Sequence, residues 1–376
     1  MLRLLFSVLV LLLSACGDNQ LQTTSESGVT VSQRMSSTPD PGFERAYQVR
    51  PFNFPQDHGA HPKFATEWWY FTGNLQSDEQ RRYGYQLTLF RVGLKPGQAK
   101  DDSDWRTHQL YMGHLAVSDI ENRKHISAER FARAAAGLAG AETFPLKVWL
   151  GPWTIQGTQQ QLFPLRLQAE TVDFGIDLTL QAGDKNPVLQ GDRGLSQKGA
   201  EPGNASYYYS YTRLPSQGSI RIGNRMTQVS GNSWFDREWS SSALATDQAG
   251  WDWFALQLDD GRDLMFYRMR GKDGTAQGFS KGVMVEQDGS TKPLSLENTR
   301  LKELETWQSE QGYRYPIEWQ LTVPSAGIDW KVKAAFEDQQ MLHTVNYWEG
   351  AVDVGGSHQG MGYLELSGYS SSSRID

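Results

Sequence analysis

The segment HPKFATEWWYFTGNL (residues 61–75) decides the fold, because a second segment farther along the chain repeats its pattern. Residues 67–75, EWWYFTGNL, align without gaps with residues 250–258, GWDWFALQL. The aligned positions include two aromatic pairs, Trp68 with Trp251 and Tyr70 with Trp253. Side chains alternate between the two faces of a strand, so these aromatic side chains would share one face in each copy.

A second match strengthens the case for a repeat. Residues 231–236, GNSWFD, align with residues 360–365, GMGYLE, and place Asp236 over Glu365. Just after the first pair of segments, LTLFR aligns with LMFYR and ends on Arg91 and Arg268. Two matches in the same order indicate a duplicated β-domain.

The chain from Phe43 onward has the pattern of short strands separated by turns. Segments such as YGYQLTLFRV and IDLTLQAG alternate or run apolar over four to eight residues. Asp260-Gly261 predicts a tight hairpin within LQLDDGRDLMFY. The alanine-rich residues 128–140 predict one short helix or a loop. We therefore expect an all-β protein.

The N-terminus has the pattern of an exported lipoprotein. An apolar run follows Arg3 and ends in Leu-Ser-Ala-Cys at Cys16, which resembles a lipobox whose cysteine receives lipid. The run is shorter than a membrane span and is typical of a signal peptide. Cys16 is the one cysteine of the sequence, so no disulfide can form within the chain. We expect lipid attachment at Cys16, with Gly17 favouring the outer membrane.

Length and composition suggest the domain organisation. The polar stretch after the cysteine predicts a flexible tether, and 376 residues are too many for one ordinary core. The net charge of −7 argues against a nucleic-acid partner. The expected division is a signal peptide (1–15), a disordered tether (16–42), β-domain 1 (43–240) and β-domain 2 (241–376).

Seven motifs along the mature chain together resemble the AttH-like family, which is related to carotenoid 1,2-hydratases and also carries the label of secreted hydrolases. The motifs are HPKFATEWWYFTGNL, PVLQGDRGLSQKG, ASYYYSYTRL, GNSWFDREWSSS, GWDWFALQLDDGRDLMFYRMR, YWEGAVDV and GMGYLELSGY. The resemblance implies two tandem lipocalin-like antiparallel β-barrels or sandwiches and an apolar ligand in an aromatic cavity. It further implies hydration of a terminal double bond in some members and ABC-transport permeases beside others.

Glu67 precedes four aromatic residues, and two interpretations stay open. Aromatic neighbours would desolvate the carboxylate, raise its pKa and make it a proton donor. Alternatively, Glu67 accepts hydrogen bonds from turn amides or pairs with an arginine such as Arg91.

Asp236 and Glu238 form the second polar group, in SWFDREWSSS. On a strand they would share one face, and two carboxylates sharing a face raise one pKa. Arg237 would point the other way. The segment falls at the junction of the two halves, where clefts often form, and an interdomain salt-bridge network is the alternative.

His114, in the expected strand YMGHLAVSD, is a candidate proton carrier facing the cavity or a hydrogen-bonded core residue. His58 and His61 lack further ligands at a recognisable spacing, so we expect no metal. The sequence has no G-x-S-x-G elbow, P-loop or dinucleotide fingerprint, and we expect no cofactor.

Two functions remain as hypotheses. The preferred one is a lipid-anchored carrier of an apolar molecule in the cell envelope. The carrier would face the periplasm from the outer membrane, and an ABC permease is a candidate partner. The alternative is a hydro-lyase or hydrolase on the same scaffold. Candidate catalytic residues are Glu67, His114, Asp236 and Glu238, and expected ligand contacts are Trp68, Trp69, Tyr70, Trp234, Trp251, Trp253, Arg91 and Arg268.

Overall fold

The computed structural model describes residues 41–97, 107–158, 161–242 and 244–369. The predicted signal peptide, Cys16 and nearly all of the tether lie outside these residues. Within them, two short 3₁₀ helices occur, η1 (Gln56–His58) and η2 (Pro324–Ala326). No helix in these ranges has the length and apolar character to cross a membrane.

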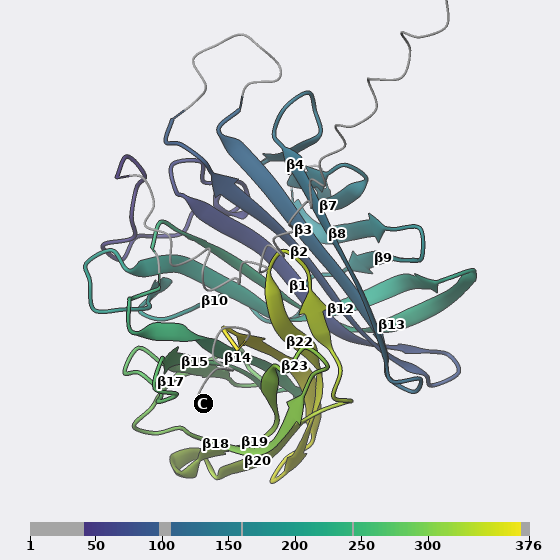
Figure 1. Cartoon of the computed structure of the whole chain (residues 1–376), viewed down its shortest axis with the longest axis vertical. Coiled ribbons are helices and arrows are strands. Elements are labelled where there is room, and N and C mark those ends of the chain that lie inside the picture. The colour runs from purple at the N-terminus through teal and green to yellow at the C-terminus, as the bar shows by residue number, and fades with distance from the viewer. Residues whose placement is uncertain (1–40, 98–106, 159–160, 243, 370–376) are drawn as a thin grey trace, which may run out of the picture.

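The remaining elements of the described chain are antiparallel strands in two sheets (Figure 1). The first sheet has thirteen described strands. Its strands, in spatial order, are β4 (Lys124–Arg133), β3 (Gln109–Asp119), β2 (Arg82–Gly93), β1 (Thr66–Ser77), β13 (Arg225–Ser240), β12 (Ala205–Ile222), β9 (Phe174–Leu180), β8 (Gln161–Glu170), β7 (Trp153–Thr158), β6 (Lys147–Leu150) and β5 (Ala139–Glu142), with β10 (Val188–Leu189) and β11 (Leu195–Gln197) beside β12.

The second sheet has ten strands among the described residues. Its order is β17 (Thr291–Ser295), β16 (Lys281–Val285), β15 (Asp263–Gly271), β14 (Gln248–Leu258), β23 (Gly360–Ser367), β22 (Asn346–Gly356), β20 (Ile328–Ala334), β19 (Arg314–Val323) and β18 (Arg300–Gln308), with β21 (Gln340–Leu342) beside β22. It curves into a nearly closed barrel, seen end-on in the lower part of Figure 1, and the first sheet forms a half-barrel. The all-β prediction is confirmed.

The two sheets repeat one arrangement. Reading β4-β3-β2-β1-β13-β12-β9-β8-β7 against β17-β16-β15-β14-β23-β22-β20-β19-β18 matches strand to strand. The registers agree as well, because Tyr70 pairs with Asp236 in the first sheet and Trp253 pairs with Glu365 in the second. These are the positions that the sequence comparison aligned, so the duplication is confirmed at the level of single residues.

One part of that comparison is wrong by two residues. Arg91 lies opposite Glu67, and in the second sheet Arg270 lies opposite Gly250, the position that matches Glu67. Arg91 therefore corresponds to Arg270 and not to Arg268. The two hairpins differ in length, and an alignment of short apolar strings cannot detect that difference.

The expected helix or loop at residues 128–140 is partly corrected: residues 134–138 form a loop between β4 and β5, and the rest is strand. Residues up to Arg133 belong to β4, where they pair along β3 from Leu110 to Asp119. Cross-strand pairing outweighs the helix propensity of the alanines.

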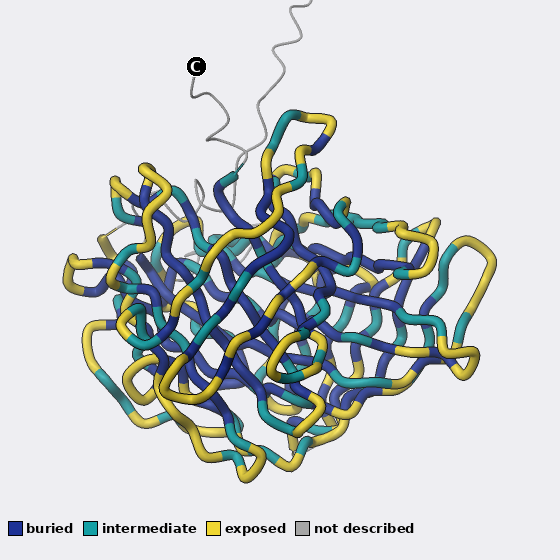
Figure 2. The backbone as a smooth tube through the Cα atoms, turned by 90° about the horizontal axis from the view of Figure 1, so that it is seen from below, coloured by how far each residue is buried: buried dark blue, intermediate teal, exposed yellow. Residues whose placement is uncertain are grey.

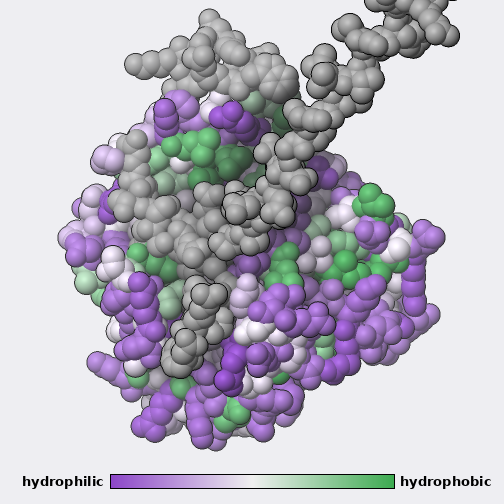
Figure 3. All heavy atoms as spheres, viewed as in Figure 1, coloured by the Kyte–Doolittle hydropathy of each residue, from purple (hydrophilic) through white to green (hydrophobic). Residues whose placement is uncertain are grey.

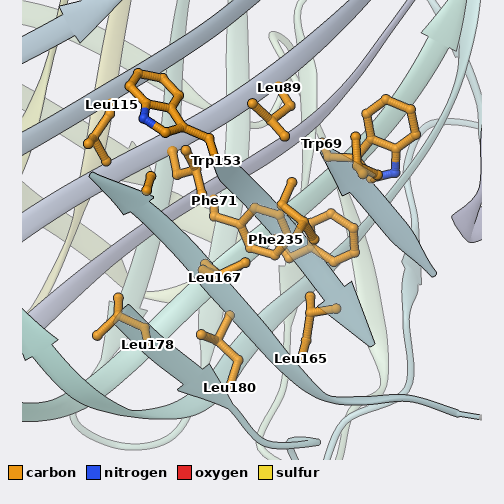
Figure 4. Packing of buried hydrophobic residues seen from close by; sticks show 14 of the residues in the cluster. Trp69, Phe71, Leu89, Leu115, Trp153, Leu165, Leu167, Leu178, Leu180 and Phe235 are labelled. Atoms are coloured by element: carbon orange, nitrogen blue, oxygen red, sulfur yellow. The ribbon is translucent and has the colours of Figure 1, made fainter. Parts of the chain in front are cut away.

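Each sheet has its own cluster of buried hydrophobic residues. Figure 2 shows long buried stretches of backbone, coloured dark blue, through the middle of the molecule. In the first core the rings of Phe71 and Phe235 stack with centroids 4.3 Å apart, and Trp69 and Trp153 lie close by (Figure 4). The face of the molecule seen in Figure 3 is mostly hydrophilic, with small hydrophobic groups between. A third apolar cluster, which includes Tyr70, Tyr208 and Trp253, joins the two sheets. This third cluster also contributes residues to the cavity described below, which lies between the two sheets.

Candidate functional site

A cavity of about 90 Å³ lies between the two sheets. Most of its lining residues come in pairs that occupy matching positions in the two halves, as the strand registers define them. The pairs are Trp68 with Trp251, Tyr70 with Trp253, Thr88 with Tyr267, Phe90 with Met269, Tyr208 with Tyr347, and Asp236 with Glu365. The two halves thus contribute the same surface to one shared site.

Four acidic side chains and one lysine lie among these aromatic residues. Asp236 and Glu238 come from β13, Glu349 from β22, Glu365 from β23, and Lys198 from the segment after β11. Isolated charges are costly in such surroundings. The protonation of each group therefore decides what the cavity can do.

Asp236 is held by three hydrogen-bond donors. Trp234 Nε1 and Ser210 Oγ donate to Oδ1 over 2.7 Å and 2.5 Å, and Tyr208 Oη donates to Oδ2 over 2.6 Å. Burial raises the pKa of Asp236 to about 7, although these donors act in the opposite direction. Near neutral pH this carboxyl is present in both its protonated and its ionised form.

Glu238 is the ionic partner of Lys198. Lys198 Nζ lies 3.2 Å from Glu238 Oε1 and 4.0 Å from the centre of the Tyr267 ring. Ser206 Oγ also donates to Glu238. Burial acts to lower the pKa of the Lys198 amine, but Glu238, Tyr267 and Asp236 together outweigh burial and raise this pKa. This ion pair occupies one side of the cavity.

Glu365 and Glu349 lie directly opposite each other on the neighbouring strands β23 and β22. Burial raises the pKa of Glu365 to about 8, and the charges of Glu238 and Asp236 add to the rise. Trp251 Nε1 donates to Glu365 Oε1 over 3.1 Å. Like charges at facing positions repel, so the pair holds at least one proton near neutral pH.

Glu349 is 1% exposed, and neither of its carboxylate oxygens makes a well-aligned hydrogen bond within the described residues, although the hydroxyls of Tyr70 and Tyr347 lie beside it. The hydroxyl of Tyr70, which also lines the cavity, likewise makes no well-aligned hydrogen bond within the described ranges. Burial, together with the charge of Glu365, raises the pKa of Glu349 well above its usual range. A buried carboxyl in this state stays protonated and can donate to a ligand or a water molecule.

Glu67 has different surroundings from those that the first interpretation expected. It is 0% exposed, but it forms ion pairs with Arg91 and Arg237, and the backbone N–H of His61 donates to both of its oxygens over 3.0 Å. Burial opposes the charge, yet Arg237 and Arg91 hold the pKa of Glu67 well below its usual range. The expected rise of this pKa is wrong, and the alternative of arginine pairing and turn amides is confirmed.

Three other predicted residues also lie away from the cavity, each on the inner side of its own sheet. Trp69 packs in the first core, under the guanidinium of Arg237 at 4.0 Å. Arg91 belongs to the Glu67 network, and Arg268 pairs with Asp252 over 2.5 Å inside the second sheet. None of Trp69, Arg91 and Arg268 is among the described residues that line the cavity.

Two predicted residues lie just behind the cavity wall. His114 is buried and shares a hydrogen bond of 2.8 Å between Nδ1 and the hydroxyl of Tyr347, which does line the cavity. Trp234 supports Asp236 and lies edge-on to Trp253, with centroids 6.1 Å apart. Trp68, Tyr70, Trp251, Trp253, Asp236 and Glu238 line the cavity itself.

Sequence reasoning missed four polar residues of the cavity. Glu365 had already been aligned with Asp236, and applying the same rule of equivalence would have made it a candidate. Glu349 and Tyr347 follow from the motif YWEGAVDV, whose strand pairs with β23. Lys198 lies in the motif PVLQGDRGLSQKG, but no local pattern there indicated that it would reach the cavity. No group of three or more His, Cys, Asp or Glu side chains in the described ranges has a geometry that could hold a metal ion.

Comparisons with known proteins agree with this architecture. A protein described as an AttH from Nitrosomonas europaea is 31% identical, with a TM-score of 0.77, over 87% of this chain and 100% of that one. Kievitone hydratase from Nectria haematococca shares the fold at 14% identity and a TM-score of 0.66, over 87% and 98%. CghA shares it at 14% and 0.52, over 91% and 98%.

A search of curated proteins gave no match. The family model AttH-like matches residues 45–369, which is nearly all of the described chain. That range includes both sheets and every residue of the cavity. The chain belongs to the AttH-like family.

Proposed function

We propose that this protein is a hydro-lyase that adds water to a double bond of a largely apolar ligand held between the two sheets. The observation that carries the proposal is the pair of buried glutamates, Glu349 and Glu365, that face each other in an aromatic cavity, where burial raises the pKa of Glu365 to about 8 and favours its protonated form. Hydration of an unactivated double bond needs an acid that can protonate carbon, together with surroundings that tolerate a cation.

The roles follow from the unequal pKa values of the cavity carboxyls. Glu365 donates its proton to one carbon, so that a C–H bond forms as the π bond breaks. The faces of Trp68, Trp251 and Trp253 stabilise the resulting cation. Asp236, in its ionised form, adds a negative charge that its three donors hold in place. Water then forms the C–O bond.

The size of the cavity limits what it can enclose. A volume of about 90 Å³ admits several water molecules or the end of a longer ligand. A terminal double bond on an extended apolar molecule matches this space. Kievitone hydratase, by its name, hydrates its substrate on the same fold, which supports the scaffold as suitable for such chemistry.

Incubation in H₂¹⁸O with an acyclic carotenoid in detergent tests the proposal. We expect one ¹⁸O atom in a hydrated product by mass spectrometry, and a fall in kcat of about 10²–10⁴-fold for Glu365→Gln. Trp149→Leu, outside the cavity, is the matched control. A Glu365→Gln variant with unchanged turnover would overturn the assignment.

The second candidate function is a carrier of an apolar ligand, with an ABC permease as its partner. It is favoured by the tryptophan-rich lining, which would bind a ligand without any reaction. Native mass spectrometry of protein purified from the envelope distinguishes the two. An unmodified lipid or polyene bound to the chain, with no turnover of it, supports the carrier.

Attachment to the outer membrane through Cys16 remains part of the proposal. It rests on the lipobox-like residues ahead of the cysteine. Palmitate labelling should be present in the wild type and lost in Cys16→Ser. Labelling that persists in the variant would refute the anchor.

A further inference from the structure

Three side chains connect the cavity with solvent at strand β4. Glu129 on β4 lies with Oε1 3.0 Å from His114 Nε2, and His114 Nδ1 lies 2.8 Å from the hydroxyl of Tyr347 on β22. His114 is 0% exposed, whereas the Glu129 side chain is 13% exposed. The chain of contacts runs from a solvent-touching carboxylate through a buried imidazole to a phenol that lines the cavity.

The contacts of Glu129 fix the direction of these hydrogen bonds. The backbone N–H and the hydroxyl of Thr344 donate to Glu129 Oε2 over 3.2 Å and 2.7 Å. Donors on this side favour the ionised carboxylate, and the pKa of Glu129 is lowered, because these hydrogen bonds and His114 outweigh its partial burial. His114 Nε2–H therefore donates to Glu129, Nδ1 accepts, and the Tyr347 hydroxyl donates to Nδ1.

The arrangement resembles that around an activated nucleophile, where an oriented histidine takes the proton of a serine hydroxyl. Here the hydroxyl group is the phenol of Tyr347. The hydroxyl of Tyr347 donates toward His114, and its oxygen lies beside Glu349 at the cavity, so a proton can reach it from that side. Tyr347 and Glu349 stand two residues apart on the same side of β22. Glu349 in turn faces Glu365 across the strand pair.

We propose that Tyr347 takes the proton of the attacking water, with His114 and Glu129 as the store that holds it until it returns to Glu365. This inference rests on the proposed hydration. As Tyr347 oxygen accepts the proton from water, its own proton passes to His114 Nδ1. The imidazolium that forms lies against the carboxylate of Glu129, which stabilises it.

The return path closes the cycle without any further reactant. Glu365 has lost its proton to carbon, and Glu349 passes its proton across the strand pair to Glu365. Tyr347 then donates to the Glu349 carboxylate as His114 Nδ1 returns a proton to the Tyr347 oxygen. Every group regains its starting state, and the net change is one water added to the double bond.

Turnover of an acyclic carotenoid is the first test. For Tyr347→Phe and His114→Gln we expect kcat to fall about 10²–10⁴-fold, with KM within about threefold of the wild type. Added imidazole should restore part of the activity of His114→Gln. His125→Gln is the control, because the half-buried His125 on β4 bonds to Ser118 Oγ over 2.9 Å and is not among the described residues that line the cavity. Glu129→Gln should show a smaller loss and a shifted pH profile.

The second test needs no substrate. Nitrogen-15 NMR of His114, assigned with His114→Gln, should show a proton on Nε2 and none on Nδ1, and Glu129→Gln should weaken that preference. A proton on Nδ1 in the wild type would overturn the relay, whether or not hydration occurs. If Glu365→Gln stops hydration while His114→Gln and Tyr347→Phe keep wild-type kcat, the relay is refuted and the hydratase stands. If the wild type hydrates none of the acyclic carotenoids tested, both proposals fall.

Discussion

Glu67 and Glu349 are buried to almost the same degree, at 0% and 1% exposure, and yet their pKa values move in opposite directions. Glu67 has two arginines and the turn N–H of His61 around it. Glu349 has no cation beside it and no well-aligned hydrogen bond among the described residues, and it faces another glutamate. Burial alone does not decide the state of a carboxyl; its partners do. The inner face of the first sheet uses a carboxylate as a structural ion, and the cavity keeps one as an acid.

The largest expected effect is on stability, from Glu67→Gln. The change leaves Arg91 and Arg237 buried without their counter-ion, which should lower the free energy of unfolding by about 3–5 kcal/mol. Urea unfolding measures it. Glu349→Gln, the matched variant, removes no ion pair and should be neutral or stabilising at pH 8. Equal losses in the two variants would remove the distinction between the two sites.

The pH dependence of stability is the next effect. Glu349 and Glu365 have pKa values raised in the folded state, that of Glu365 from 4.5 to about 8. Between these values the folded chain holds protons that the unfolded chain has lost, so stability falls as pH rises. Because of Glu365 alone, the wild type should lose roughly 2–4 kcal/mol between pH 5 and pH 8 relative to Glu365→Gln. Thermal unfolding at a series of pH values measures this loss. If the stabilities of the two proteins change in parallel with pH, the raised pKa values are contradicted.

Ligand binding should depend on both halves alike. Trp68 and Trp251 occupy matching positions and both line the cavity. Replacing either with leucine should weaken carotenoid binding about tenfold or more, measured by quenching of tryptophan fluorescence. Trp69→Leu, on the inner face, should reduce stability and leave the affinity of the folded protein near that of the wild type. Loss of affinity from one half alone would place the ligand on one sheet rather than between them.

The smallest effect is expected at an exposed ion pair. Arg166 and Asp177 lie 2.7 Å apart on β8 and β9, with side chains 54% and 42% exposed. Asp177→Asn should change stability by about 0.2–1 kcal/mol, and added salt should reduce the difference further. A loss of stability as large as that of Glu67→Gln would show that exposed and buried ion pairs do not differ in their contribution to stability.

Much of the fold could be predicted from short repeated strings. The counterparts of Trp68, Tyr70 and Asp236 in the second half could be identified because large aromatic and acidic residues recur at fixed spacing on a strand. The location of the cavity could not be read in this way. Periodicity assigns Trp68 and Trp69 to opposite faces, but it does not reveal which face meets the other half.

The candidate site was predicted in part, for a related reason. Asp236 and Glu238 were recognised from their local spacing and their place at the junction. Glu67 was open between two interpretations, because the decision depended on Arg237, which lies 170 residues away in sequence and adjacent in space. The relay through His114 needs Tyr347 from the other half, a contact across 233 residues that no local pattern contains.

The matching registers have a consequence for the origin of the site. A half-chain alone would leave the aromatic face around Tyr70 or Trp253 in water, so it would associate with a copy of itself. Such a homodimer would place its two-fold axis through the cavity, and both walls would carry identical chemistry. Fusion into one polypeptide released that constraint, and an acid on one wall could then diverge from its counterpart on the other.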